Sequence, residues 1–165
     1  GELSSIYPDA MVIYRLARWR PSDLLNAFIR HLALNTIRRD NLPTVTRLIC
    51  KDAVWEFDAV PDTKAILQHY LSFYWQGLMS PLLFFSRTSF AYASKKIVNE
   101  KSDQDALKEA LKAWLGGYTH HGESADAYHR ICFKDMDILN ENFASTALGI
   151  YAPVLAAGRL IPVAS

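Results

Sequence analysis

The chain has 165 residues, of which 50% are hydrophobic and 21% are charged. This length is typical of one domain with a buried core, and this composition excludes a disordered tail. The chain carries 18 Lys and Arg against 17 Asp and Glu, and a formal net charge of +1 gives it no overall attraction for nucleic acid.

The first predicted elements are a strand and a helix. Residues Met11–Arg20 are rich in β-branched and aromatic side chains without clean alternation, which is typical of a strand covered on both faces near one end. Pro21 ends this run. Ser22 can cap a helix from Asp23 to about Ile37, because apolar residues recur there at helical spacing.

Two further strands follow the predicted helix. Thr44–Lys51 is a β-branched run, and Asp52 and Ala53 form a tight turn into Val54–Phe57, where apolar and polar residues nearly alternate. The expected order is therefore strand–helix–strand–strand, with the helix as the crossover between two strands of one sheet.

After residue 60 the sequence predicts mainly helices. Asp62 can cap a helix with apolar rows that is closed by Gly77. The run Pro81–Phe85 is consistent with a buried strand or an irregular core segment, and Phe90–Ile97 with a helix.

Three more helices complete the predicted set. Ser102 begins a capping-box pattern ahead of an amphipathic helix through Leu115, the most clearly marked element of the chain. Ser124 can cap a helix through Phe133, and Ala144–Leu155 predicts a last helix.

The small net charge hides an uneven distribution along the chain. Residues 1–51 carry eight Lys and Arg against four Asp and Glu, a net +4, whereas the remainder carries −3. Nearly all of these cations are arginine, whose planar guanidinium suits phosphate and carboxylate. A contact surface and a set of surface arginines with packed apolar stems are both open explanations.

The cysteines and the apolar runs bear on the compartment. Cys50 and Cys132 are each flanked by apolar residues, which predicts two buried free thiols in a reducing cytosol. No apolar run approaches the ~18 residues of a membrane span, and no signal peptide is visible. We therefore expect a cytoplasmic protein that makes no contact with a membrane.

One string looks like part of a nuclease active site. Pro61–Lys64 resembles a compressed Asp…(Asp/Glu)-x-Lys signature, in which two carboxylates hold Mg²⁺ and a lysine steers the attacking water. Here Asp62 directly precedes an amphipathic helix, where aspartate is a routine cap. Glu56 and Asp58 could share a strand face, but no lysine completes a set there. We interpret the string as a helix cap.

Histidines and aromatic residues form two further groups. A zinc site would need His120, His121 and His129 to converge with Cys132, and adjacent histidines in a loop are more typical of surface polar residues. The aromatic residues 73–75 could stack bases only if their side chains faced the same side of a helix, and consecutive helical positions point in different directions. We therefore predict that these three side chains pack in the core.

Two strings carry a resemblance to a known family. Arg18–Leu25 and Gln76–Leu83, with the strand pair between them, resemble the carboxyl-terminal region of RecC, the gamma chain of bacterial exodeoxyribonuclease V. The likeness follows the order of elements over residues 11–165 and is thin after residue 90. It implies an α/β fold with a degenerate PD-(D/E)XK nuclease-like core, of strand–helix–strand–strand order, and a helix-rich carboxyl-terminal half.

The resemblance also implies an organisation and a function. Residues 1–165 would be a single domain, the carboxyl-terminal fragment of a larger subunit, with a sheet-containing part at 1–60 and a mainly helical part at 61–165. It would be a non-catalytic scaffold for duplex splitting and subunit assembly in double-strand break repair and recombination. Its partners would be RecB-type and RecD-type motor subunits, which use ATP and Mg²⁺, and DNA ends and forks. The domain itself would need no cofactor.

The predicted first strand bears on this expectation. An active nuclease relative would carry an acidic residue and a lysine two positions apart there, whereas Met11–Arg20 carries arginines, which repel Mg²⁺. We therefore predict no catalytic and no metal-binding residue. Four residues of this segment are candidate DNA contacts: Arg15, Arg18, Trp19 and Arg20.

The alternative is an active divalent-metal-dependent DNA nuclease that uses Glu56, Asp58, Asp62 and Lys64. The sequence therefore leaves open whether the domain is itself an enzyme. The scaffold interpretation further predicts exposed apolar patches where partner subunits dock.

Overall fold

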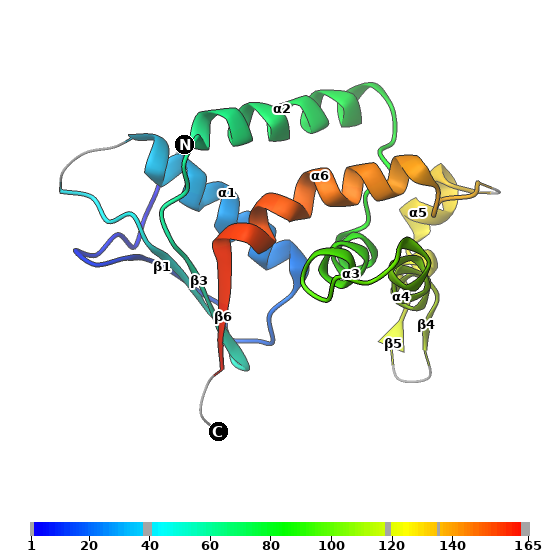
Figure 1. Cartoon of the computed structure of the whole chain (residues 1–165), viewed down its shortest axis with the longest axis horizontal. Coiled ribbons are helices and arrows are strands. Elements are labelled where there is room, and N and C mark those ends of the chain that lie inside the picture. The colour runs from blue at the N-terminus through cyan, green and yellow to red at the C-terminus, as the bar shows by residue number, and fades with distance from the viewer. Residues whose placement is uncertain (1, 38–40, 118–119, 135, 163–165) are drawn as a thin grey trace. The chain divides into compact units, whose positions relative to one another are not determined.

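The computed structural model describes residues 2–37, 41–117, 120–134 and 136–162. The chain forms two compact units. The sheet unit comprises residues 1–72 and 156–165, and the helical unit comprises residues 73–155. The two ends of the chain, blue and red in Figure 1, therefore belong to the same unit.

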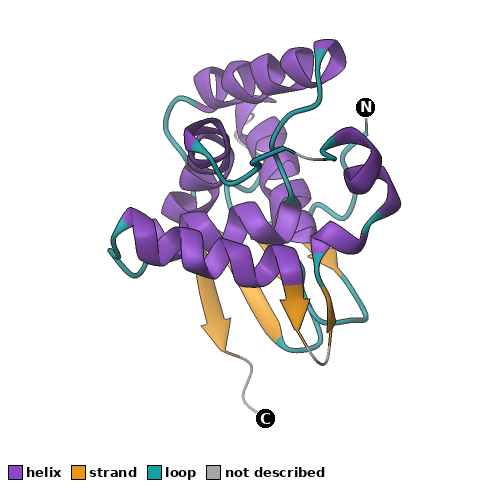
Figure 2. Ribbon diagram, turned by 90° about the vertical axis from the view of Figure 1, so that its right-hand side faces the viewer, coloured by secondary structure: helices purple, strands orange, loops and turns teal. Residues whose placement is uncertain are grey.

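A four-stranded sheet forms the centre of the sheet unit (Figure 2). β1 and β2 are parallel and are joined through helix α1 (Pro21–Ile37), whereas β2, β3 and β6 are antiparallel neighbours. The predicted order strand–helix–strand–strand is confirmed, and the fold is α/β with a small mixed sheet. The strands, in their order across the sheet, are β1 (Met11–Tyr14), β2 (Thr46–Ile49), β3 (Ala53–Phe57) and β6 (Gly158–Pro162).

Two features of the sheet differ from the prediction. β1 ends at Tyr14 rather than at Arg20, because its partner β2 ends at Ile49, the residue paired with Tyr14. The sequence predicts no strand at Gly158–Pro162. This segment is short and acquires strand geometry by pairing along the whole of β3, a contact distant in sequence.

Helix α1 covers one face of the sheet. Leu24, Phe28, His31 and Leu32 are fully buried, and their spacing places them on one side of the helix. The ring of Phe28 packs against Phe57 of β3, with the ring centroids 5.3 Å apart. The core of the sheet unit therefore lies between α1 and this face.

The other face of the sheet carries two rows of side chains that cross the strands. The register gives an apolar row and a charged row: Tyr14, Ile49, Val54 and Ile161, then Arg47, Glu56 and Arg159. In the charged row Glu56 accepts hydrogen bonds from both arginines, from Arg47 Nε at 2.6 Å and from Arg159 Nη2. These ion pairs connect β6 to β3 and β2.

Helix α2 (Thr63–Met79) follows the sheet. Asp62 precedes it with a φ of 56°, and the carbonyl of Asp62 accepts the amide of Ile66 at 3.2 Å. The helix therefore starts directly after Asp62 and extends two residues beyond the predicted end at Gly77.

Four α-helices form most of the helical unit. The unit also contains a 3₁₀ helix, η1 (Glu123–Ala125), and a pair of two-residue antiparallel strands, β4 (Gly116–Gly117) and β5 (His120–His121). The run Pro81–Phe85 is an irregular core segment. The four helices are α3 (Ser86–Ile97), α4 (Asp103–Leu115), α5 (Ala127–Cys132) and α6 (Glu141–Ala157). Their core contains Leu83, Phe85, Tyr92, Ala106, Ala110, Ile138, Phe143 and Ala147.

The predicted helix ends of this unit are partly correct. Ser102 caps α4, because its Oγ accepts the amide of Asp105 at 3.2 Å. The predicted cap at Ser124 is wrong: Ser124 lies in η1, and Asp126 caps α5 instead. The last helix continues through Pro153, as far as Ala157.

Three side chains that the sequence places in the interior are exposed. Cys50 is buried as predicted, but Cys132 is exposed, and both thiols are free. Tyr74 and Trp75 are 61% and 63% exposed, so the prediction of core packing is wrong for these two, whereas Phe73 is half-buried. Within the described parts of the chain, none of the helices has the length and hydrophobicity that crossing a membrane requires.

Candidate nucleic-acid interface

The loop between β1 and α1 carries all four predicted DNA contacts, and we name residues 15–20 the basic loop. Because β1 and β2 are parallel, their carboxyl ends meet at one edge of the sheet. The amide of Arg15 donates to the carbonyl of Ile49 at 2.8 Å, and the amide of Lys51 donates to the carbonyl of Ala17 at 3.0 Å. The basic loop is therefore attached to the end of β2.

Arg15 is neutralised within the chain. Its Nη1 lies 2.9 Å from Asp23 Oδ1, and its Nε donates to the carbonyl of Arg18 at 3.1 Å. These contacts fix the path of the basic loop. Arg15 therefore positions the loop, and its ion pair with Asp23 leaves it less available to bind a phosphate than Arg18 and Arg20.

Asp23 also sets the start of α1. Its Oδ2 accepts the amide of Arg20 at 3.1 Å, which is the contact that the third residue of a helix makes with the capping position. Pro21 occupies the first helical position, where a missing N–H costs nothing. The predicted cap at Ser22 is therefore wrong, since Ser22 lies inside the first turn.

Arg18 and Arg20 are the accessible cations of the basic loop. Both side chains are exposed, and in the described part of the chain neither guanidinium is paired with a carboxylate. The positive end of the α1 dipole lies directly after Arg20. Exposed guanidinium groups beside a helix amino terminus can form charge-assisted hydrogen bonds to phosphate oxygens.

Trp19 lies against the sheet. Its ring makes an edge contact with Trp55 of β3, with centroids 5.4 Å apart and planes at 67°. Its backbone amide donates to Asp52 Oδ1 at 3.0 Å. The packing of Trp19 on Trp55 attaches the basic loop to the sheet. The indole is half-buried, so part of its surface remains exposed to solvent for the predicted contact with DNA.

A shallow hollow of about 260 Å³ adjoins the basic loop. Its lining residues are Tyr14, Arg15, Leu16, Ile49, Cys50 and Lys51, so apolar and cationic side chains share the hollow. Leu16 is 95% exposed. Burial raises the pKa of the Cys50 thiol.

Lys51 is a candidate contact that sequence reasoning missed. It is exposed and lies two residues after the end of β2, whereas Arg15 directly follows β1. The parallel pairing of the two strands brings these positions to the same edge. A prediction that the two strands pair in parallel would therefore have identified Lys51 as a candidate DNA contact beside the basic loop.

The residues of the nuclease alternative have other partners. Both carboxylate oxygens of Glu56 accept from arginines, and these hydrogen bonds, from Arg47 first, lower the pKa of Glu56. Asp58 is exposed, and its carbonyl contacts His31 Nε2 at 3.1 Å. Asp62 and Lys64 are exposed at the start of α2.

The residues weighed as zinc ligands have other surroundings, and the side chain of His120 lies outside the described residues. His129 Nδ1 contacts the carbonyl of Glu123 at 2.9 Å, and its ring packs against Phe85 and Trp114. His121 and Cys132 are exposed. Among the residues that the structure describes, no three His, Cys, Asp or Glu side chains come together as metal ligands would.

Comparison with known proteins identifies the family. Residues 1–97 match the family described as the RecC C-terminal domain, which is more than half of the chain. The match includes the whole of the basic loop, α1, β2, β3 and α2. A search of the curated proteins found no match to the chain. The chain therefore belongs to the RecC C-terminal domain family.

Proposed function

We propose that this domain is a non-catalytic scaffold that handles DNA in a RecBCD-type exodeoxyribonuclease V. Membership of the family implies a domain of a RecC subunit, and hence a RecBCD complex that acts in DNA repair. Within that cytoplasmic complex the domain would support duplex splitting and subunit assembly. RecB-type and RecD-type motor subunits would supply the chemistry that uses ATP and Mg²⁺.

The observation that carries the proposal is the arrangement of cations at the sheet edge. Arg18, Arg20 and Lys51 are exposed at the carboxyl ends of β1 and β2, and Arg15 holds the loop that presents them. DNA phosphates are bound by such clusters without base recognition, which suits a protein that contacts DNA of any sequence.

A degenerate nuclease-like core is the second part of the proposal. The order β1–α1–β2–β3 supports it, and so does the presence of arginines after β1, where an active relative would carry carboxylates. We infer that the basic loop is a phosphate-facing surface that replaces a metal site.

The contacts of Glu56 argue against metal-dependent cleavage by this domain. Each oxygen of this carboxylate already accepts from a guanidinium group, so a divalent ion bound there would lie beside two positive charges that repel it. We expect the purified domain to cleave neither single-stranded nor double-stranded DNA with Mg²⁺ or Mn²⁺. Cleavage that is lost in a Glu56→Gln variant would establish the nuclease alternative instead.

The direct test is the double substitution Arg18→Ala/Arg20→Ala in the assembled complex. Each lost phosphate contact reduces the slope of log affinity against log salt by about one, so we expect weaker binding of forked DNA and a smaller salt slope. Arg130→Ala/Lys134→Ala is the matched control, because it removes two exposed cations from the helical unit. Unchanged fork binding and unwinding in the Arg18/Arg20 variant would refute the role of the basic loop.

A further inference from the structure

Exposed and half-buried side chains alternate along the basic loop. Residues 16, 18 and 20 are exposed, whereas residues 15, 17 and 19 are half-buried. A period of two residues is that of an extended chain attached to a neighbour along one side. The half-buried side therefore carries the attachments of the loop, and the other side presents Arg18 and Arg20 to solvent.

The turn between β2 and β3 supplies two of these attachments. The backbone amide of Lys51 donates to the carbonyl of Ala17 at 3.0 Å. The side chain of Asp52 reaches further along the loop, and its Oδ1 accepts the backbone amide of Trp19 at 3.0 Å. Asp52 therefore holds the one residue that lies between the two accessible arginines.

The hydrogen bond from Trp19 is the single contact of its kind at Asp52. Asp23 also holds this part of the loop, through the amide of Arg20, but the same carboxylate pairs with Arg15 at the other end. In the described part of the chain the Asp52 side chain accepts one hydrogen bond, from Trp19. Asp52 is exposed, so its removal leaves no cavity in the core. Substitution of Asp52 therefore acts on the loop and spares the rest of the sheet unit.

The charge of Asp52 works against phosphate binding. A carboxylate beside Arg18, Arg20 and Lys51 repels the anion that these cations attract. If Asp52 acted through its charge alone, its removal would strengthen the binding of DNA. The hydrogen bond to the loop acts in the opposite direction, so the two roles predict changes of opposite sign.

We propose that Asp52 is a positioning residue for the binding of DNA phosphates by the basic loop. It acts through Trp19, whose held amide and packed indole keep the loop in the conformation that presents Arg18 and Arg20 together. Without this hydrogen bond the loop samples other conformations, and the apparent affinity falls with the fraction that remains competent. The inference rests on the proposed function, because it takes phosphate binding by the basic loop as its starting point.

The test compares Asp52→Ala with Asp52→Asn in the assembled complex. Both substitutions remove the same negative charge, whereas asparagine alone keeps a side-chain oxygen that can accept the Trp19 amide. We expect the alanine variant to bind forked DNA about fivefold more weakly than the asparagine variant, the value of one hydrogen bond. The asparagine variant should bind at least as tightly as the wild type.

The salt dependence distinguishes positioning from direct contact. The slope of log affinity against log salt should be equal in the two Asp52 variants, because the same phosphates are bound once the loop is in place. Asp58→Ala is the matched control, since Asp52 directly precedes β3 and the exposed Asp58 directly follows it. This control should change the affinity for forked DNA less than twofold.

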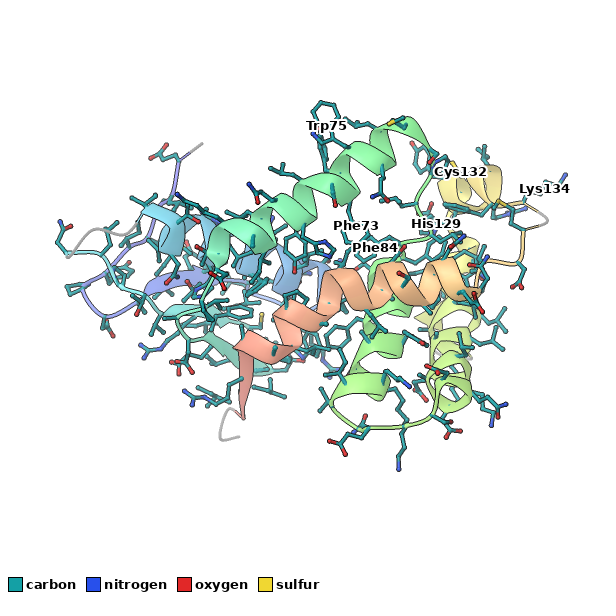
Figure 3. All side chains as sticks on the ribbon, turned by 45° about the horizontal axis from the view of Figure 1, so that its top comes forward. Phe73, Trp75, Phe84, His129, Cys132 and Lys134 are labelled. Atoms are coloured by element: carbon teal, nitrogen blue, oxygen red, sulfur yellow. The ribbon has the colours of Figure 1, made fainter. Side chains whose placement is uncertain are left out.

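Hydrogen exchange separates order in the loop from stability of the fold. Deuterium uptake by the peptide over residues 14–21 should be faster in the alanine variant than in the asparagine variant, with equal uptake elsewhere in the sheet unit. The helical unit, which contains the residues His129 and Lys134 labelled in Figure 3, serves as the internal reference. Faster uptake throughout the sheet unit of the alanine variant would show a role in the fold and overturn the inference.

The outcomes separate the inference from the proposed function. Equal affinities of the two Asp52 variants, or tighter binding by the alanine variant, overturn the inference. A smaller salt slope in the alanine variant also overturns it, because phosphate contacts are then lost outright. In each case weaker fork binding by Arg18→Ala/Arg20→Ala leaves the proposed function intact. Unchanged fork binding by that double variant overturns the proposed function and the inference with it.

Discussion

Single residues set local conditions in the core, and His31 is the clearest case. It is fully buried between α1 and the sheet, with Nδ1 2.9 Å from Thr46 Oγ1 and Nε2 3.1 Å from the carbonyl of Asp58. A carbonyl only accepts, so Nε2 carries the proton and Nδ1 accepts from the threonine hydroxyl. Burial lowers the pKa of His31 to about 4.

The lowered pKa of His31 predicts a loss of stability in mild acid. Well above pH 6.5 the imidazole is neutral in both the folded and the unfolded state, so it adds no pH dependence there. As the pH falls from 6.5 towards 4, the unfolded chain binds a proton that the folded chain refuses, and the free energy of unfolding drops by up to about 3 kcal/mol. Urea unfolding of wild type and His31→Leu at pH 7 and pH 4.5 measures this. Parallel pH profiles would contradict it.

Gly122 is constrained by space rather than by backbone conformation. A Cβ built there would lie 2.1 Å from the carbonyl oxygen of Trp114 and 2.3 Å from the carbonyl carbon of Leu115. These are backbone atoms at the end of α4, which cannot turn aside as a side chain can.

Two glycine substitutions should therefore have opposite effects. Gly122→Ala should destabilise the helical unit by about 1–3 kcal/mol through overpacking. Gly77 lies within α2, and a Cβ at this position would lie 3.4 Å from a side-chain atom of Leu82, which is ordinary contact. Gly77→Ala should raise the free energy of unfolding by up to about 1 kcal/mol, because alanine has the higher helix propensity. Thermal unfolding compares the two, and equal shifts would show that the contact at Gly122 relaxes freely.

At the scale of elements, helix α3 is capped by a residue far away in sequence. Its own capping residue, Phe85, offers no side-chain acceptor. Glu123 of η1 supplies one: its carboxylate accepts the amides of Arg87 at 3.0 Å and Thr88 at 2.7 Å. A carboxylate at this end also interacts favourably with the helix dipole. The contact connects η1 to the start of α3.

Removal of this cap should be measurable. Glu123→Ala should lower the free energy of unfolding by about 1–2 kcal/mol, as loss of a helix cap does. Glu109→Ala is the control, because Glu109 makes an exposed ion pair with Lys112 that should contribute less than about 0.5 kcal/mol. Denaturant unfolding measures the free energy of unfolding of both variants. If Glu123→Ala lowers it no more than Glu109→Ala does, water replaces the carboxylate as the helix cap.

Elements with local signals were predictable from sequence, and elements that depend on distant contacts were not. The capping pattern at Ser102 and the apolar spacing of α1 lie within single turns of chain. β6 forms because it pairs with β3, about a hundred residues earlier, and no local pattern records that pairing. Core packing was predicted for Tyr74 and Trp75 because consecutive helical positions point in different directions and cannot form one base-stacking row. Both side chains are exposed, because exposure depends on what the rest of the chain leaves uncovered.

The candidate site was predictable to the same degree. Arg18 and Arg20 were identified from residue type and from their place in the segment Met11–Arg20, which was predicted as the first strand. Lys51 joined them only once the parallel register of β1 and β2 was known. The pairing of Arg15 with Asp23, and of Trp19 with Trp55, depends on side-chain geometry that a sequence does not contain.

For the whole molecule, near-neutral charge is compatible with a DNA-handling role. The first third of the chain carries a net +4 that the remainder nearly cancels, and three of its cations that are exposed among the described residues, Arg18, Arg20 and Lys51, lie at one sheet edge. Long-range attraction by this domain alone should be weak. A subunit that shares DNA with partners needs local phosphate contacts rather than a large overall charge.

The most direct test of this account is a crosslinking measurement in the assembled complex. A photoreactive residue replaces exposed Ser22, in the first turn of α1 beside the basic loop, and in a separate variant replaces exposed Asn99 after α3. On illumination with forked DNA, we predict a crosslink to DNA from position 22 and none from position 99. A crosslink from position 22 to a protein subunit alone, or equal DNA crosslinking from both positions, would contradict the proposal that the basic loop faces DNA.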